Sequence, residues 1–383
     1  MRRIELRTAS SKYLKQEKKS KERCSDTKCT CTDEKGTYAE MMWDKEIDLQ
    51  EIEGLYAGNA QDEEAGTGVT ALVFPRGAAA GCKISGGGPA SRETGLTYSE
   101  TAENRIHSIV LSGGSAYGLA AAQGVMECLE KRGIGYQTSF ALVPLVCQSC
   151  IYDLNYGRAD VRPDASMGYA ACENALLQKP LVMGNAGAGT GATVGKLKTM
   201  RNACKSGLGW FAVQLGELKM AAVVSVNAMG DVYDPSTGQK LAGMKNDERT
   251  DWLDAEAYMA EVYRESQRAQ KECRTAADGK QAEEGSAVPQ NTTIGAVITN
   301  AEFHKAQMNK IASMAQNAYA RCIRPVATMS DGDTIYAASI GDIKADVNLT
   351  GSLASQVMQE AITRAVKSAQ IQDSEFLARV SWK

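Results

Sequence analysis

Asn291 and Thr292 join two chemically different stretches of the chain. A hydrophilic tract ends just before them at "SAVPQ", and the residues that follow, "TTIGAVIT", have the pattern of a buried β-strand. A threonine hydroxyl is a weak nucleophile until a neighbouring base takes its proton. The α-amino group, with an ordinary pKa of about 7.7–8.0, can serve as that base when the threonine is itself a chain terminus. The junction therefore suggests backbone cleavage before Thr292, although an ordinary loop entering an edge strand fits the same residues.

Histidine-based hydrolase chemistry has little support in the sequence. The stretch "GGSAYG" approaches the G-x-S-x-G nucleophile elbow, but Tyr117 stands where the second glycine is required. The chain has 2 histidines. His107 lies in an apolar strand pattern and His304 opens a helix, so we expect structural roles for both.

Two further motifs resemble known sites but depart from them. The stretch "GNAGAGTGATVGKLK" lacks the first glycine of a phosphate-binding loop at Thr190 and the hydroxyl after the lysine at Leu197. We interpret it as a glycine-rich loop lining another pocket, with Lys196 pointing into it. Cys147 and Cys150 have thioredoxin-like spacing, but no helix start follows to lower a thiol pKa. We expect buried, reduced cysteines there, and the sequence leaves a redox role open.

The composition of the chain argues against several classes of protein. The 383 residues carry a formal net charge of −3, which gives no basic footprint for nucleic acid. No apolar run is long enough for a membrane span, and no secretory signal is recognisable. The 11 cysteines are scattered, as is usual in a reducing cytoplasm. The cluster Cys24, Cys29 and Cys31 lacks a nearby fourth ligand, so we expect no metal and no cofactor.

The elements that must position these residues are a mixture of strands and helices. Strands are expected at 66–75 (ending at Pro75), at 292–300 and at "TIYAAS", which follows the turn "SDGD". Helices are expected after "GGSAYG", around 250–270 and over 303–323, with another at about 352–369. The elements do not alternate strictly, which favours an α+β layered fold over a doubly wound one.

Several long motifs in one order resemble the self-processing β-aminopeptidase family. That family includes the L-aminopeptidase/D-esterases and the 6-aminohexanoate-oligomer (nylon) hydrolases. The resemblance covers about residues 46–370 and is closest to the nylon-hydrolase branch, whose nucleophile is threonine. The motifs that carry it are "GTGVTALVFPRGAAAGCKISGGGPASRET", "IHSIVLSGGSAYGLAAAQGVMECLEKRGIGY", "GNAGAGTGATVGK", "VVSVNAMGDV", "NTTIGAVITNA" and "DGDTIYAAS".

The resemblance implies a four-layer αββα sandwich of the N-terminal-nucleophile-hydrolase kind. Residues 46–291 would form the large subunit of a single domain and residues 292–383 the small subunit after autocleavage. The subunits would stay together and assemble further as αβ units, as a tetramer or larger. Residues 1–45 are expected to be a charged, disordered extension and 245–290 an exposed linker, and neither has a counterpart that we can place.

The same resemblance assigns roles to residues at the matching motif positions. Thr292 resembles the nucleophile, and Asn291 the residue before the cut. Asn227 in "VNAMG" resembles the amide that stabilises the oxyanion. A tetrahedral intermediate does need preorganised donors of this type.

Four further residues complete the expected site. Lys196 in "TVGK" and Tyr152 in "IYDL" resemble pocket residues. Asp331 and Asp333 in "DGD" resemble the acidic pair that positions the nucleophile and its amine. Carboxylates suit that task, because a terminal threonine ammonium needs negative charge nearby to orient it.

The function expected from these residues is a self-cleaving N-terminal-threonine amidohydrolase or aminopeptidase. It would act on short peptide, β-peptide or ω-amino-acid amides through an acyl-threonine ester. An acyltransferase of the same fold, passing the acyl group to an amine, stays open as an alternative. A small molecule or short peptide is the expected partner, with no nucleic acid and no membrane.

Overall fold

The computed structural model describes residues 42–275 and 291–380. The extension expected before residue 42, with its three clustered cysteines, lies outside the described residues, as does the end of the expected linker. The last residues of the expected extension, from residue 42 on, belong to the folded domain, because the Trp43 ring packs edge-on against Phe211, with 5.5 Å between the ring centroids.

Among the described residues, ten strands are joined by hydrogen bonds, nine of them in one path. They are β1 (Lys45–Glu46), β2 (Tyr56–Asp62), β3 (Thr67–Ile84), β4 (Ser91–Arg92), β5 (Ile106–Ser112), β8 (Val146–Cys150), β11 (Leu208–Leu215), β12 (Leu218–Asn227), β15 (Thr292–Ala301) and β17 (Thr334–Ile343). The order is β1-β11-β12-β15-β17-β3-β5-β8-β4, and β2 also pairs with β3. Most neighbours are antiparallel, whereas β15 runs parallel to β17 and β5 parallel to β8.

Strand β3 bends and so divides the path into two sheets. Residues 67–73 pair with β2 and β5, whereas residues 79–84 pair with β17. Between these halves the register shifts, Pro75 offers no N–H, and Gly77 has a left-handed φ of 73°. The expected strand end at Pro75 is therefore wrong, because the chain turns a corner there and continues into the other sheet.

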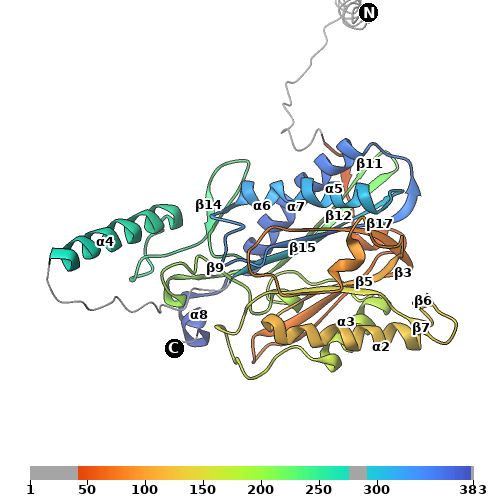
Figure 1. The fold of residues 1–383 in the computed structure, drawn as a ribbon, viewed down its shortest axis with the longest axis horizontal. Coiled ribbons are helices and arrows are strands. Elements are labelled where there is room, and N and C mark those ends of the chain that lie inside the picture. Colours follow the sequence, from red (N-terminus) through yellow and green to blue (C-terminus); the bar gives the residue numbers. More distant parts are fainter. Residues whose placement is uncertain (1–41, 276–290, 381–383) are drawn as a thin grey trace, which may run out of the picture. The chain divides into compact units, whose positions relative to one another are not determined.

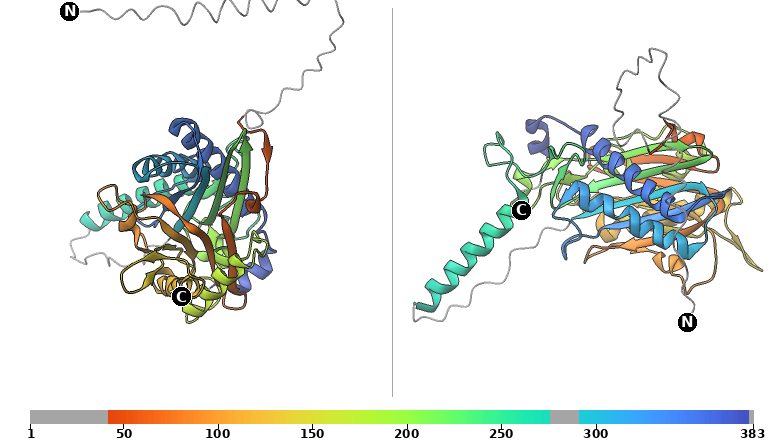
Figure 2. Two further views of the ribbon diagram at one scale, coloured as in Figure 1. Left: turned by 90° about the vertical axis from the view of Figure 1, so that its right-hand side faces the viewer. Right: turned by 90° about the horizontal axis from the view of Figure 1, so that it is seen from above.

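The two sheets pack face to face, and helices cover both outer faces (Figures 1 and 2). Alternation along β12 shows the layering: Ala221 and Val223 lie in the core between the sheets, whereas Met220 and Val224 lie in the core under the helices. The covering helices are α2 (Ala121–Lys131) and α3 (Ala165–Leu176) on one side, and α5 (Lys305–Ala315), α6 (Asn317–Cys322) and α7 (Val347–Lys367) on the other. This is the four-layer αββα sandwich that the family resemblance implies.

The remaining elements are short or peripheral. Within the described ranges they are β6 (Tyr136–Gln137), β7 (Leu142–Val143), β9 (Thr193–Val194), β10 (Cys204–Lys205), β13 (Asp231–Tyr233), β14 (Lys240–Ala242), β16 (Ile323–Arg324), α4 (Ala255–Thr275), α8 (Asp373–Arg379) and 3-10 turns at Leu49–Glu51, Thr94–Thr97, Ser115–Ala120, Gly187–Gly189 and Met200–Asn202. The single helix expected over 303–323 is interrupted at Gln316, between α5 and α6. In the part of the chain that the structure covers, no helix combines the length and apolar character needed to cross a bilayer.

Candidate active site

Strand pairing places Thr292 opposite Asn227. Strand β15 begins at Thr292, and its antiparallel register with β12 pairs Thr293 with Val226 and Thr292 with Asn227. Both residues are buried, with 4% and 0% of their surface exposed. The expected nucleophile and the expected oxyanion amide, 65 positions apart in the sequence, are therefore brought together by the sheet itself.

The turn "SDGD" holds the peptide bond between Asn291 and Thr292. The Asn291 N–H donates to the Ser330 carbonyl over 3.0 Å, and its carbonyl oxygen accepts the Gly332 N–H over 2.8 Å. The Thr292 hydroxyl also donates to this carbonyl oxygen. The threonine oxygen thus lies against the carbonyl that precedes it, and a backbone donor already points at the carbonyl oxygen.

Asp331 and Asp333 flank that donor and are fixed by backbone amides. Asp333 accepts the Thr293 N–H on Oδ1 over 2.6 Å and the Ala327 N–H on Oδ2 over 2.9 Å. Oδ2 of Asp331 accepts the N–H and the hydroxyl of Thr328, over 2.9 and 2.7 Å. Burial, and secondarily the neighbouring Asp331 carboxylate, raises the pKa of Asp333 to about 7. The acidic pair expected from the sequence is therefore assembled, and one member can carry a proton near neutral pH.

Lys196 fixes the side chain of Asn227. Its Nζ donates to Asn227 Oδ1 over 2.8 Å and to the Asn227 carbonyl over 3.0 Å. Oδ1 also accepts the Thr193 N–H, and Nδ2 donates to the Tyr152 carbonyl over 2.9 Å. Because Oδ1 already accepts these hydrogen bonds, the Asn227 amide can offer only its NH2 group to another partner. One of its two hydrogens is used in the bond to Tyr152, which leaves one free to donate. Burial lowers the pKa of Lys196 to about 7, against the opposing pull of Asp331, Asp153 and Asp333.

Sequence reasoning missed Asp153, a fully buried carboxylate next to Tyr152. Its Oδ1 accepts the Gly114 N–H and its Oδ2 accepts the Thr67 hydroxyl, both over 2.7 Å. Burial raises its pKa to about 6. The carboxylate ties the turn at Gly114, where φ is 82°, to the end of β8. The only sequence signal was the acid directly after Tyr152 in "IYDL", which no motif singled out.

A cavity of about 310 Å³ opens above Thr292. Its walls come from five segments that are far apart in the sequence. They are formed by Gly88, Ala90, Ser115, Cys150, Tyr152, Asn291, Thr292, Met329 and Ser330. Tyr152 is among these lining residues. Lys196, which the sequence analysis expected to point into a pocket, is not among them, and its Nζ hydrogen-bonds to Asn227.

The motifs set aside in the sequence have structural roles. His107 accepts the Leu145 N–H on Nδ1, and burial lowers its pKa; His304 caps the start of α5. Cys147 and Cys150 are buried free thiols, and burial raises the pKa of Cys150 to about 12. Across the described ranges, no group of three or more His, Cys, Asp and Glu side chains is arranged to hold a metal ion.

Comparison with known proteins identifies the family to which this geometry belongs. The model of peptidase family S58 matches residues 48–375. The chain belongs to peptidase family S58. A curated relative described as an uncharacterised aminopeptidase, from Mycobacterium leprae, is 36% identical over 285 residues, which are 73% of this chain and 72% of the relative.

A further relative and a solved structure support the activity class and the fold of this S58 protein. The 6-aminohexanoate-oligomer endohydrolase of Kocuria is 31% identical over 327 residues, covering 82% of this chain and 84% of that enzyme. The solved L-aminopeptidase D-Ala-esterase/amidase of Ochrobactrum anthropi, described as a variant of the Ntn-hydrolase fold, superposes with a TM-score of 0.60 at 16% identity. That match covers 87% of this chain and 95% of the solved chain, and it confirms the fold. The protein is thus a hydrolase of the aminopeptidase and oligomer-hydrolase family.

Proposed function

We propose that this chain cuts itself between Asn291 and Thr292 and then hydrolyses amides with the new N-terminal threonine. The observation that carries the proposal is the contact of the Thr292 hydroxyl with the Asn291 carbonyl, whose oxygen already accepts the Gly332 N–H. Both the nucleophile and an oxyanion donor therefore lie at the bond to be cut.

Self-cleavage requires a base other than the α-amine, which does not yet exist. Lys196 is suited to this role because its lowered pKa of about 7 leaves much of it neutral at neutral pH, and it bonds to Asn227, opposite Thr292. The Thr292 oxygen attacks the Asn291 carbonyl carbon while the base takes the hydroxyl proton. The Thr292 nitrogen then leaves with a proton, which gives an ester, and water releases the Asn291 carboxylate.

In the mature enzyme the Thr292 amine takes over as base. It accepts the hydroxyl proton as the oxygen attacks the substrate amide, and the leaving amine carries a proton away. Asn227 would stabilise the oxyanion through its remaining N–H, and Asp331 and Asp333 would orient the ammonium form. Water then hydrolyses the acyl-threonine ester. The aminopeptidase and oligomer-hydrolase relatives support short peptide, β-peptide or ω-amino-acid amides as substrates.

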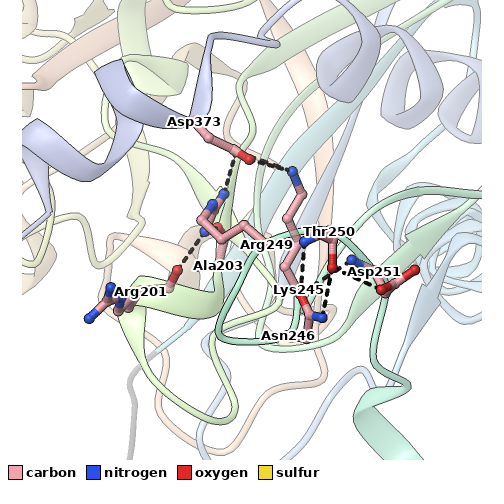
Figure 3. Close-up of polar contacts among 8 residues, drawn as sticks. All are labelled: Arg201, Ala203, Lys245, Asn246, Arg249, Thr250, Asp251 and Asp373. Carbon is pink, nitrogen blue, oxygen red and sulfur yellow. Dashed lines mark hydrogen bonds and ion pairs between the residues drawn. The ribbon is translucent and has the colours of Figure 1, made fainter.

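The two products, residues 1–291 and 292–383, would stay together. The proposed small subunit contributes β15 and β17 to the middle of one sheet, between β12 and β3 of the large subunit. Figure 3 shows a second connection: Asp373 of α8 accepts from Lys245 over 2.9 Å and from Arg249 over 2.7 Å. The Arg249 side chain is only 6% exposed, so the turn at 245–251 belongs to the folded domain and not to an exposed linker. Further assembly into tetramers or larger oligomers follows from the family resemblance.

Gel electrophoresis and mass spectrometry of the purified full chain test the proposal. We expect two chains, the smaller starting at Thr292, and one uncut chain for Thr292→Ala. The matched Thr292→Ser variant keeps a hydroxyl and should still cut. In a quenched reaction with an amide substrate, the acyl group should be on Thr292. A small chain that starts elsewhere, or an acyl group on Ser115, would show that the nucleophile is wrongly assigned.

A further inference from the structure

Lys205 is a buried lysine that has no part in the mechanism proposed above. It lies on β10, directly opposite Thr193 on β9, and only 3% of its surface is exposed. Its Nζ donates to the carbonyl oxygens of Gly189 over 3.0 Å, of Ala192 over 2.9 Å and of Ser206. A lysine ammonium has three hydrogens, so these three carbonyls use all of its donors.

This arrangement of a charge is expensive. The ammonium is held by carbonyl oxygens and not by a carboxylate. Moving an ammonium out of water costs free energy that neutral acceptors repay only in part. A methionine would fill nearly the same space without that cost. We therefore expect the Lys205 ammonium to have a task that an apolar side chain cannot perform.

The peptide unit between Ala192 and Thr193 links Lys205 to the proposed site. Its carbonyl oxygen accepts from Lys205, and its N–H donates to Asn227 Oδ1 over 3.0 Å. Because a peptide unit is planar and its C=O and N–H point in opposite directions, fixing the oxygen also fixes the N–H. A cation on the oxygen also polarises the unit and makes the N–H a stronger donor.

The bond from Thr193 helps to decide which way the Asn227 amide faces. The oxygen and the NH2 group of an amide have similar shapes, so hydrogen bonds select one of two orientations. In the observed orientation Oδ1 accepts from Thr193 and from Lys196 Nζ, and Nδ2 donates to the Tyr152 carbonyl. With the amide reversed, its oxygen would take the place of the N–H groups and repel an oxyanion.

We propose that Lys205 is a positioning residue, which acts through the Ala192–Thr193 peptide to hold the Asn227 amide with its N–H toward the oxyanion. The proposal rests on the function proposed above, in which Asn227 stabilises that oxyanion. The contacts between Lys205 and Asn227 involve neither residue of the bond to be cut, so self-cleavage does not remove them. Since Lys205 has no donor left for a substrate, its loss should lower kcat and leave KM unchanged.

Lys205→Met removes the ammonium and keeps an unbranched side chain of similar length. The loop should still fold, because both carbonyls keep a backbone donor. The Gly189 oxygen accepts the Ala192 N–H over 3.2 Å, and the Ala192 oxygen accepts the Ser206 N–H over 3.0 Å. Self-cleavage, which has the Gly332 N–H as its own oxyanion donor, should still go to completion, so that the cut variant can be assayed.

Lys305→Met is the matched control. Lys305 is 1% exposed, and its Nζ donates to the Thr101 carbonyl over 3.2 Å, the Thr101 hydroxyl over 2.8 Å and the Ala102 carbonyl over 2.5 Å. Neither Thr101 nor Ala102 lines the cavity above Thr292. Its replacement therefore removes a buried ammonium of the same kind at a place that does not lead to Asn227.

The first measurement determines kcat and KM, per mole of cut chain, with alanyl, 3-aminobutyryl and 6-aminohexanoyl p-nitroanilides. For whichever anilides the parent hydrolyses, Lys205→Met should lower kcat by about 10- to 100-fold, somewhat less than complete loss of an oxyanion donor. KM should stay within about threefold of the parent, and Lys305→Met should keep kcat within about twofold. A parent-like kcat in Lys205→Met, or an equal loss in Lys305→Met, would overturn the proposal.

The second measurement follows hydrogen exchange at the Thr193 N–H by fragmentation mass spectrometry. Exchange should be at least about tenfold faster in Lys205→Met than in the parent, and unchanged in Lys305→Met. Lys205→Arg, which keeps the charge, is measured in parallel in case the methionine variant does not fold. In either variant of Lys205, a loss of kcat without faster exchange at Thr193, or faster exchange with the parent's kcat, contradicts the proposal.

Failure of the underlying function gives a different result. If Asn227→Ala has the parent's kcat, or Thr292→Ala is as active as the parent, the oxyanion donor or the nucleophile is wrongly assigned. The exchange measurement still reports whether Lys205 holds the Ala192–Thr193 peptide.

Discussion

Replacing Gly332 with alanine should slow self-cleavage by about 10- to 100-fold. A Cβ built at Gly332 would lie 2.8 Å from Thr292 Oγ1, 2.9 Å from the Gly88 carbonyl oxygen and 3.2 Å from Thr292 Cγ2. Ordinary contact starts at 3.4 Å, so the threonine oxygen or the turn must move by about 0.6 Å (3.4 − 2.8). Either movement separates the hydroxyl from the carbonyl or the Gly332 N–H from its acceptor. Misplacement of about 1 Å, or loss of one oxyanion donor, costs about 100-fold in comparable enzymes.

The assay follows pulse-labelled, freshly translated chain by gel electrophoresis as the uncut band disappears. Gly88→Ala is the matched control, because its Cβ would have no neighbour closer than the Asp331 carbonyl oxygen at 3.8 Å. Thermal unfolding of both variants checks that a slow rate is not a folding defect. If Gly332→Ala is cut at the parent rate, the Thr292 hydroxyl in the position seen in this structure is not the attacking group.

Three further outcomes follow from the site. Prolonged treatment with a chelator should leave amide hydrolysis unchanged, because the proposed chemistry uses only protein groups; activity restored by zinc or manganese would contradict this. In the cleaved enzyme, Asp333→Asn should lower kcat and move the rising limb of the pH profile to lower pH, because loss of the carboxylate removes a charge that raises the pKa of the Thr292 amine; an upward shift would show that the carboxylate acts otherwise. Asp373→Asn should weaken subunit association by about 1 kcal/mol, as for a partly exposed ion-pair cluster, and so lower the urea midpoint of dissociation, whereas Asp160→Asn at an exposed pair should have no measurable effect.

The site residues that lie on strands and in the turn could be predicted from the sequence, because the sequence patterns of a strand and a turn are local. "TTIGAVIT" has the composition of a buried strand, and "SDGD" is a turn by its residue types. The four layers, by contrast, depended on resemblance to a family. Periodicity alone could not show that β3 serves both sheets, because a bend at Pro75 and Gly77 has the same sequence signature as a strand end.

The contacts that loops make around the site could not be predicted in the same way. Asp153 bonds to Gly114, which is 39 positions away, and Lys196 bonds to Asn227 across 31 positions. Contacts of this kind depend on which loops meet at one edge of the sheet. No periodic pattern in a single sequence predicts such a meeting. The left-handed conformation of Ser115 could not be predicted either, because Gly, Asn and Asp are the residues that usually adopt it.

The position of the proposed cleavage bond at the start of β15 explains how one threonine could perform two reactions. Strand pairing on both sides holds the chain from Thr292 onward, with Thr292 opposite Asn227 on β12 and Ile294 opposite Thr334 on β17. Asn291, in contrast, is held by the turn, through Ser330 and Gly332. Cutting between them would release only the turn-held residue, which itself lines the cavity, and would leave the threonine fixed in the sheet. The departing residue would then vacate the space in which a substrate carbonyl can meet the same hydroxyl and the same Gly332 N–H, so self-cleavage would open the catalytic site without rebuilding it.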